Sequence, residues 1–305
     1  MIKTKKNSTA IYRCYIFLFL GLALGCAWHP KAKELTELEN QYLESFFKHL
    51  FENTTAGYVL YGERPLFYCA FKSIENTIPG TAEHRDAVLF TQGLNTWKQL
   101  NIQGKNYLLV FFTSNETKPF QEFILINKKA FKDIVRNNLP LFQYKLGAQV
   151  NEQNLLDSIL STGFPSLLKC HEALQGILFG YGVENSLTYE RGNTLRKKAL
   201  GSSKINPPFQ SISEPITPDE LKEHIIHYVA SQGGTGQDLL EELSDFSFYE
   251  PENEDEIIPK IPFSFHLKSE ESKKLLAAYK ESEKTVINLQ AQKNFVEKIL
   301  KRLKQ

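Results

Sequence analysis

The stretch Tyr107-Leu-Leu-Val-Phe-Phe-Thr113 is followed, after the connector Ser114-Asn-Glu-Thr-Lys-Pro119, by Phe120-Gln-Glu-Phe-Ile-Leu-Ile126. Two apolar runs on either side of a polar connector that contains proline are typical of a β-hairpin. The first run is almost continuously apolar, so we expect both of its faces to be covered. The hairpin indicates an antiparallel sheet in a chain whose other patterns are mostly helical.

A second hairpin is predicted upstream, from the strand-like runs 56–61 and 65–71, which are separated by turn-forming residues. Helical patterns flank these runs at 34–51, which has a wide apolar face, and at 82–100. We therefore expect residues 34–127 to form an antiparallel sheet of two hairpins with covering helices.

From residue 128 onward the strand patterns stop, and residues 128–305 are predicted to be mostly helical. The strands are too few and too clearly paired for a doubly wound sheet, so the predicted fold class is α+β. The parts 34–127 and 128–305 form either two units or one continuous domain. Helices are expected at 129–138, 152–161, 165–179, 184–199, 217–232 and 268–305.

The last of these, residues 268–305, is predicted to be one long C-terminal helix with a heptad-like apolar seam. Ser282 and Lys293 interrupt the seam, and this favours a helix packed along its own domain. The alternative is a self-associating scaffold in which these helices pair between copies. The seam positions are Leu275, Tyr279, Ser282, Val286, Leu289, Lys293, Val296, Leu300 and Leu303.

The amino terminus has the plan of a secretory signal peptide. Its first 13 residues carry four basic residues and no acid, and the run Cys14–Leu24 has no charge. Such a run is too short to span a bilayer, which takes about 20 apolar residues. We therefore predict that residues 1–25 are a signal peptide.

The sequence Leu22-Ala-Leu-Gly-Cys26 resembles a bacterial lipobox, although Ala23 stands where that family prefers leucine. The resemblance implies a lipid on Cys26, a short tether at 26–33, and attachment to the membrane of the bacterial cell envelope. Ala27 replaces the aspartate that signals inner-membrane retention, which favours the outer membrane. The alternatives are an uncut signal anchor, or cleavage without a lipid.

The charge of the mature chain argues against nucleic acid as a partner. Without residues 1–25 the chain has 32 basic and 35 acidic residues, a net charge of −3. A nucleic-acid-binding domain has a clearly basic face. The expected partners are therefore the membrane, through the lipid, and a protein or ligand of unknown identity.

Catalytic motifs are not evident, and no catalytic residue, cofactor or metal is predicted. The neighbours Cys170 and His171 would point about 100° apart on a helix, so they do not form a nucleophile–base pair. Cys69 and Cys170 are either two buried thiols or an oxidised pair. The alternative function is an envelope hydrolase with a dispersed site, which would use Cys69 or Cys170 with one of His49, His84 or His171.

Two further motifs do not meet the requirements of a metal site or a phosphate site. His224 and His227 share one helix face, but a metal needs three or four ligands and one helix cannot enclose it. The glycine-rich stretch Gly233–Gly236 follows a helix and lacks the lysine of a phosphate-binding loop.

The segment Gly176-Ile-Leu-Phe-Gly180-Tyr-Gly182 is the least ordinary part of the chain, because three glycines in seven residues weaken a helix. Close packing or a helix end would explain them, and so would a ligand that approaches the backbone. The candidate ligand-binding residues are Gly176, Gly180, Tyr181 and Gly182. Tyr58, Tyr61, Tyr68, Tyr181 and Tyr189 would extend such a site if they lined one cleft.

Three stretches resemble uncharacterised lipoproteins of chlamydia-like intracellular bacteria: Gly57-Tyr-Val-Leu-Tyr-Gly62 with the following Pro65-Leu66, Gly176-Ile-Leu-Phe-Gly-Tyr-Gly-Val-Glu-Asn-Ser-Leu187 and Leu275-Leu-Ala-Ala-Tyr-Lys280. The resemblance implies the same cell-envelope location and brings no known activity. We therefore expect a non-enzymatic envelope lipoprotein with a binding or structural role.

Overall fold

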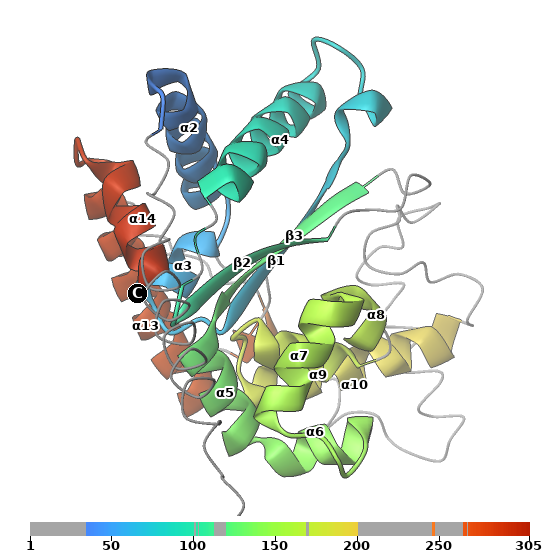
Figure 1. Cartoon of the computed structure of the whole chain (residues 1–305). Helices are drawn as coiled ribbons and strands as arrows, with labels where there is room; N and C mark the ends of the chain where they lie inside the picture. The colour runs from blue at the N-terminus through green and yellow to red at the C-terminus, as the bar shows by residue number, and fades with distance from the viewer. Residues whose placement is uncertain are drawn as a thin grey trace, which may run out of the picture.

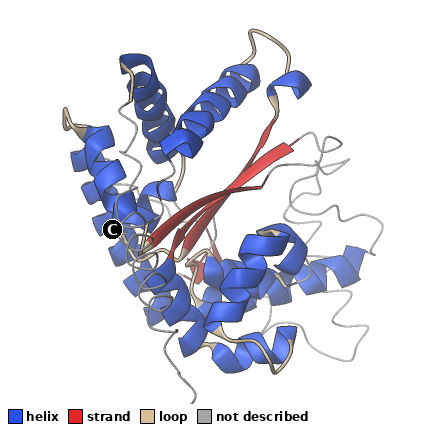
Figure 2. Ribbon diagram, in the orientation of Figure 1, coloured by secondary structure: helices blue, strands red, loops and turns tan. Residues whose placement is uncertain are grey.

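The protein is an α+β structure in which a small sheet lies between two groups of helices (Figures 1 and 2). This computed structural model describes residues 35–100, 102, 104–112, 120–168, 171–200, 246–247, 265–266 and 268–305. The signal peptide, Cys26, the tether, Cys170, the predicted helix 217–232 with its two histidines, and the stretch 233–236 lie outside these residues.

The sheet contains β1 (Leu66–Lys72), β2 (Tyr107–Phe112) and β3 (Phe120–Asn127) in the order β1-β3-β2. Both neighbours pair antiparallel with β3, which confirms the hairpin predicted from residue 107 to 126. Its first strand, β2, lies at the edge of the sheet and is mostly half-buried, with apolar contacts on both faces. The central strand β3 buries its last five residues.

The second predicted hairpin is wrong, because Ala56–Tyr61 forms the helix α3 and not a strand. All residues of α3 except Tyr61 are buried, so the run has no polar face. Without one, the spacing of apolar residues does not distinguish a helix from a strand. At Gly57 a Cβ atom would lie 2.7 Å from a methyl group of Val286, so this helix packs closely against the C-terminal part of the chain. The strand β1 pairs instead with β3.

One face of the sheet packs against α2 (Glu37–Asn53) and α4 (Ala82–Leu100). The helix α2 begins with a capping box between Thr36 and Glu39. This core is rich in phenylalanine; the rings of Phe46 and Phe90, for example, meet edge to face at 5.8 Å.

The other face packs against helices from the middle of the chain. The helix predicted at 165–179 is two helices, because the first ends at Leu168 and the second begins at Glu172. Leu139–Leu146 is a helix that was not predicted. The elements are α5 (Lys128–Asn137), α6 (Leu139–Leu146), α7 (Glu152–Thr162), α8 (Phe164–Leu168), α9 (Glu172–Leu178) and α10 (Val183–Leu200). Two short strands, β4 (Phe246–Ser247) and β5 (Phe265–His266), pair with each other.

The C-terminal segment is not one helix but two, α13 (Glu270–Gln290) and α14 (Phe295–Lys304). The break falls on exposed polar residues around Lys293, and it turns the chain so that Phe295 is buried against the ring of Phe51, 5.7 Å away. Tyr279 and Val286 of the predicted seam are buried in the protein's own core, as expected for a helix packed along its domain.

The C-terminal helices bury their apolar side chains in the same core as α2 and α3, and the first part of α13 also reaches the side of α5 and the α9–α10 turn (Figure 1). The two cores share the sheet, and the chain crosses between them more than once. Within the described part of the chain, no helix is both long enough and apolar enough to cross a membrane.

Candidate functional site

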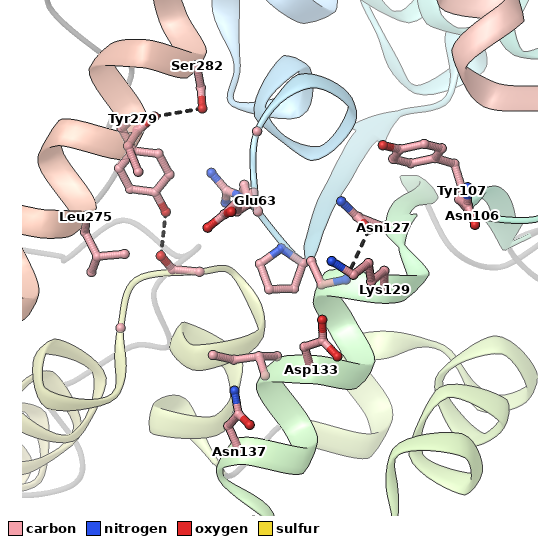
Figure 3. A pocket seen from close by; sticks show the side chains of 18 of the residues that line it. Glu63, Asn106, Tyr107, Asn127, Lys129, Asp133, Asn137, Leu275, Tyr279 and Ser282 are labelled. Atoms are coloured by element: carbon pink, nitrogen blue, oxygen red, sulfur yellow. Dashed lines mark hydrogen bonds between the residues drawn. The ribbon is translucent and has the colours of Figure 1, made fainter. Parts of the chain in front are cut away.

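A cavity of about 620 Å³ lies where α5, α13 and the turn between α9 and α10 meet the chain that links α3 to β1 (Figure 3). Figure 3 shows Tyr279 and Leu275 of α13 facing Asp133 and Asn137 of α5 across the opening. The α3–β1 chain, residues 62–65, lies between them. The remaining wall comes from Asn106, Tyr107, Asn127 and Arg302.

Gly180 and Gly182, two of the four predicted binding residues, line this cavity. Gly180 has φ +78° and ends α9: its N–H donates to the carbonyl of Ile177, and the N–H of Tyr181 donates to that of Gly176. This pair of bonds is the Schellman ending of a helix, which needs a residue in the left-handed region. The glycine at 180 is therefore explained by a helix end at the cavity wall.

Gly182 allows the C-terminal helices to reach this turn. It has φ +86°, and a Cβ atom there would lie 2.5 Å from Glu271 Oε2. The Glu271 carboxylate accepts hydrogen bonds from the backbone N–H groups of Val183 and Glu184, both at 2.9 Å, at the start of α10. A carboxylate at the amino end of a helix is favourable for both the orphan N–H groups and the helix dipole.

The other two predicted residues do not line the cavity. At Gly176 a Cβ atom would lie 2.5 Å from Ser186 Oγ, so this glycine permits close packing of α9 on α10. Tyr181 points its hydroxyl toward the guanidinium of Arg64, at 3.4 Å from Nη2.

Arg64 is the functional candidate that sequence reasoning missed, because the residues Gly62-Glu-Arg-Pro65 have the composition of an exposed turn. Its side chain is only 4% exposed although it carries a charge, and it lines the cavity. Nε donates to the carbonyl of Leu66 at 3.0 Å, and the guanidinium lies 5.4 and 5.9 Å from the ring centres of Tyr181 and Phe179. Nη1 is buried and has no hydrogen-bond partner.

Tyr279 of α13 forms the opposite wall. Its hydroxyl donates to the carbonyl of Gly180 at 2.5 Å, and its ring stacks on Tyr58 at 5.4 Å. Burial raises the pKa of Tyr279, so its proton stays in place for this bond. The hydroxyl of Tyr58 donates to the buried carboxylate of Glu283, also on α13. These contacts fix α13 against both α3 and the α9–α10 turn.

Arg302 of α14 adds a second cation to the wall. Its Nε donates to the carbonyl of Leu60, at the end of α3, and its guanidinium lies 5.1 Å from the ring centre of Tyr107. A cation at the carboxyl end of a helix is favourable for the exposed carbonyls there.

The five tyrosines do not line one cleft. Tyr58 is buried in the core, Tyr68 stacks on Phe164, and Tyr189 is exposed on α10. None of these three lines the cavity.

The described thiol and histidines do not form a catalytic pair. Cys69 forms no disulfide and packs toward the core on the α2–α4 side of the sheet. Burial raises its pKa to about 12, which keeps the sulfur protonated and unreactive. His49 contacts Asp86 and Phe90, and His84 contacts Thr77. His171, at the start of α9, lies next to Cys170, which is outside the described residues.

No cluster of histidine, cysteine and carboxylate ligands that could hold a metal is present in the described ranges. Comparison with known proteins gives no further guide to the site: no family model matches the chain, and neither a curated protein nor a solved structure matches it.

Proposed function

We propose that this protein is a lipid-anchored protein of the bacterial cell envelope that binds a small ligand and is not an enzyme. The observation that carries the binding role is the cavity beside Gly180 and Gly182. Its volume of about 620 Å³ is within the range of small-molecule sites, roughly 300–1,000 Å³. Its wall combines apolar side chains, such as Leu275 and Ile134, with many polar and charged ones, such as Asn137 and Arg302.

The rigidity of the cavity supports this role. The Glu271 carboxylate and the Tyr279 hydroxyl bind α13 to the α9–α10 turn, so two walls that lie far apart in the sequence are held together without a ligand. A preformed site loses little conformational entropy on binding.

The location rests on the sequence of the amino terminus. The short apolar run that ends at Cys26 supports export, and Ala27 favours the outer membrane. Metabolic labelling with a tagged fatty acid tests the anchor by comparing the wild type with Cys26→Ser. We expect label in the wild type alone. Equal labelling of both proteins, or of neither, would reject the anchor.

Two neighbouring alanines on α13 test the cavity. Ala277 and Ala278 are both exposed, but only Ala278 lines the cavity. Ala278→Trp should fill the opening, whereas Ala277→Trp places the same side chain outside it. A library of neutral fragments would be screened by ligand-observed NMR against the full-length protein in detergent.

We expect a set of fragments that bind the wild type and the Ala277→Trp protein but not Ala278→Trp. If every fragment that binds does so equally to all three proteins, the cavity is not a binding site and the proposed function fails.

A further inference from the structure

Among the described residues, the guanidinium of Arg64 is a buried charge without a counter-charge. The side chain is 96% buried, and in the described part of the chain no carboxylate forms an ion pair with it. An arginine stays charged at any physiological pH, and a buried charge is costly unless it is paired. The rings of Phe179 and Tyr181 offset only part of this cost.

The acidic residues around the cavity are held elsewhere or exposed. The Glu271 carboxylate accepts the N–H groups at the start of α10, and Asp133 forms an ion pair with Arg136. Glu63 directly precedes Arg64 in the chain and is exposed to solvent. The Tyr181 hydroxyl lies 3.4 Å from Arg64 Nη2. Burial raises the pKa of Tyr279, so this neighbouring phenol stays neutral and supplies no negative charge.

We propose that Arg64 is the anion-binding residue of the cavity and that the ligand carries a carboxylate or a phosphate group. This inference rests on the proposed binding function and names the chemical class of its ligand. The guanidinium presents a planar fork of N–H donors, which matches both anions. Nη1 lacks an acceptor, and within the described part of the chain Nη2 makes one long contact, 3.4 Å, with the Tyr181 hydroxyl.

Binding requires a small movement of the arginine, because Nη1 is itself covered in the unliganded protein. The long contact with the Tyr181 hydroxyl is the bond that an anion would replace. Arg302 and Lys129, which also line the cavity, add positive charge around the opening. The apolar side chains of Ile134 and Leu275 leave room for an apolar part of the same ligand.

Three probes of similar size distinguish charge from shape: benzoate, phenyl phosphate and the neutral benzamide. Their dissociation constants would be measured by calorimetry on the full-length protein in detergent, at constant ionic strength. We expect at least one anion to bind ten times or more tightly than benzamide. Which anion it is identifies the chemical group that the ligand carries.

In Arg64→Gln this preference should fall to about one, with the benzamide constant unchanged. Arg85→Gln is the control, because this arginine is exposed on α4 and lies outside the cavity lining. Equal binding of all three probes to the wild type, binding of none, or a preference that persists in Arg64→Gln would overturn the inference. Benzamide binding that Ala278→Trp abolishes, without a preference for anions, would leave the proposed function standing.

A second variant keeps the test decisive if Arg64→Gln does not fold. Arg64→Lys retains the charge and most of the volume but loses the planar fork. We expect it to lower the preference for the anion at least threefold. An unchanged preference in this variant would also overturn the inference.

Discussion

Gly182 and Gly80 have nearly the same positive φ, +86° and +87°, but different surroundings. At Gly182 a Cβ atom would lie 2.5 Å from Glu271 Oε2, whereas at Gly80 nothing lies within 4 Å. We expect Gly80→Ala to lower the free energy of unfolding by about 1 kcal/mol through backbone strain alone. Gly182→Ala should cost about 2–4 kcal/mol, because it also displaces the carboxylate.

Urea denaturation of both variants measures this difference. Equal losses would mean that Glu271 does not hold the turn, and the account of Gly182 would be wrong.

The carboxylate of Glu271 should matter more than that of its neighbour. Glu271 accepts backbone N–H groups of α10, whereas the exposed Glu270 pairs with Lys273 on its own helix. We expect Glu271→Gln to lower the free energy of unfolding by about 1 kcal/mol, as for other helix caps. Glu270→Gln should change it by less than about 0.5 kcal/mol. Thermal unfolding of the two proteins compares them, and equal shifts would contradict the capping role.

At the scale of residues, the sequence predicts where the backbone is unusual but not which charged side chains are buried. The crowding of glycines from Gly176 to Gly182 predicted an unusual segment, and two of them line the cavity. Arg64 could not be singled out, because its burial depends on α9 and α13, which lie more than 100 residues away in the chain. The role of Glu271 could not be predicted either, because no sequence pattern near it indicates a contact with α10.

At the scale of elements, the errors share a physical cause. The run Ala56–Tyr61 is apolar on every side, so its sequence does not distinguish a strand from a buried helix, and tertiary contacts decide. Leu66–Lys72 and Phe120–Asn127 were recognised because strand patterns are clear where turns flank them. Helix α13 ends at Gln290, and a short turn of exposed residues follows it. The apolar spacing continues across this turn, so the sequence pattern predicts a single helix.

The packing of α3 on α13 can be tested with two adjacent residues. Val286 is 1% exposed and touches the open side of Gly57, whereas Ile287 is 46% exposed. We expect Val286→Ala to lower the free energy of unfolding by about 2 kcal/mol, since it leaves a cavity at a tight contact. Ile287→Ala should cost less than about 1 kcal/mol. Similar values for both would mean that α13 is not packed as described.

At the scale of the whole molecule, the C-terminal helices α13 and α14 pack against the N-terminal helices α2 and α3. The helices α13 and α14 complete the core that α2 and α3 begin, so the predicted part 128–305 contributes to the cores on both faces of the sheet. No local sequence pattern predicts this packing. The apolar positions of a helix show that one of its faces is buried, but they do not show which face of the sheet it covers.

The shared core should make the protein sensitive to alkaline pH. Burial raises the pKa of Tyr61 to about 12, and it also raises the pKa of Tyr279, while an unfolded tyrosine ionises near 10. Above pH 10 the unfolded chain therefore loses protons that the folded protein keeps, and stability falls with rising pH. Each such tyrosine contributes up to about 1.4 kcal/mol per pH unit.

Urea midpoints between pH 9 and 11 measure this slope. Tyr279→Phe should make the slope shallower, whereas Tyr144→Phe should leave it unchanged, because Tyr144 is 87% exposed. A slope that is the same in all three proteins would contradict the burial of Tyr279.

The central claim is that a lipid-anchored protein holds a ligand in the cavity beside α13. Native mass spectrometry of the full-length protein, released gently from its own membranes, tests both parts together. We expect the wild type and Ala277→Trp to show the acylated chain with an additional bound small molecule, and Ala278→Trp to show the acylated chain alone. A chain without acyl mass, or the same bound mass in all three proteins, would contradict the account.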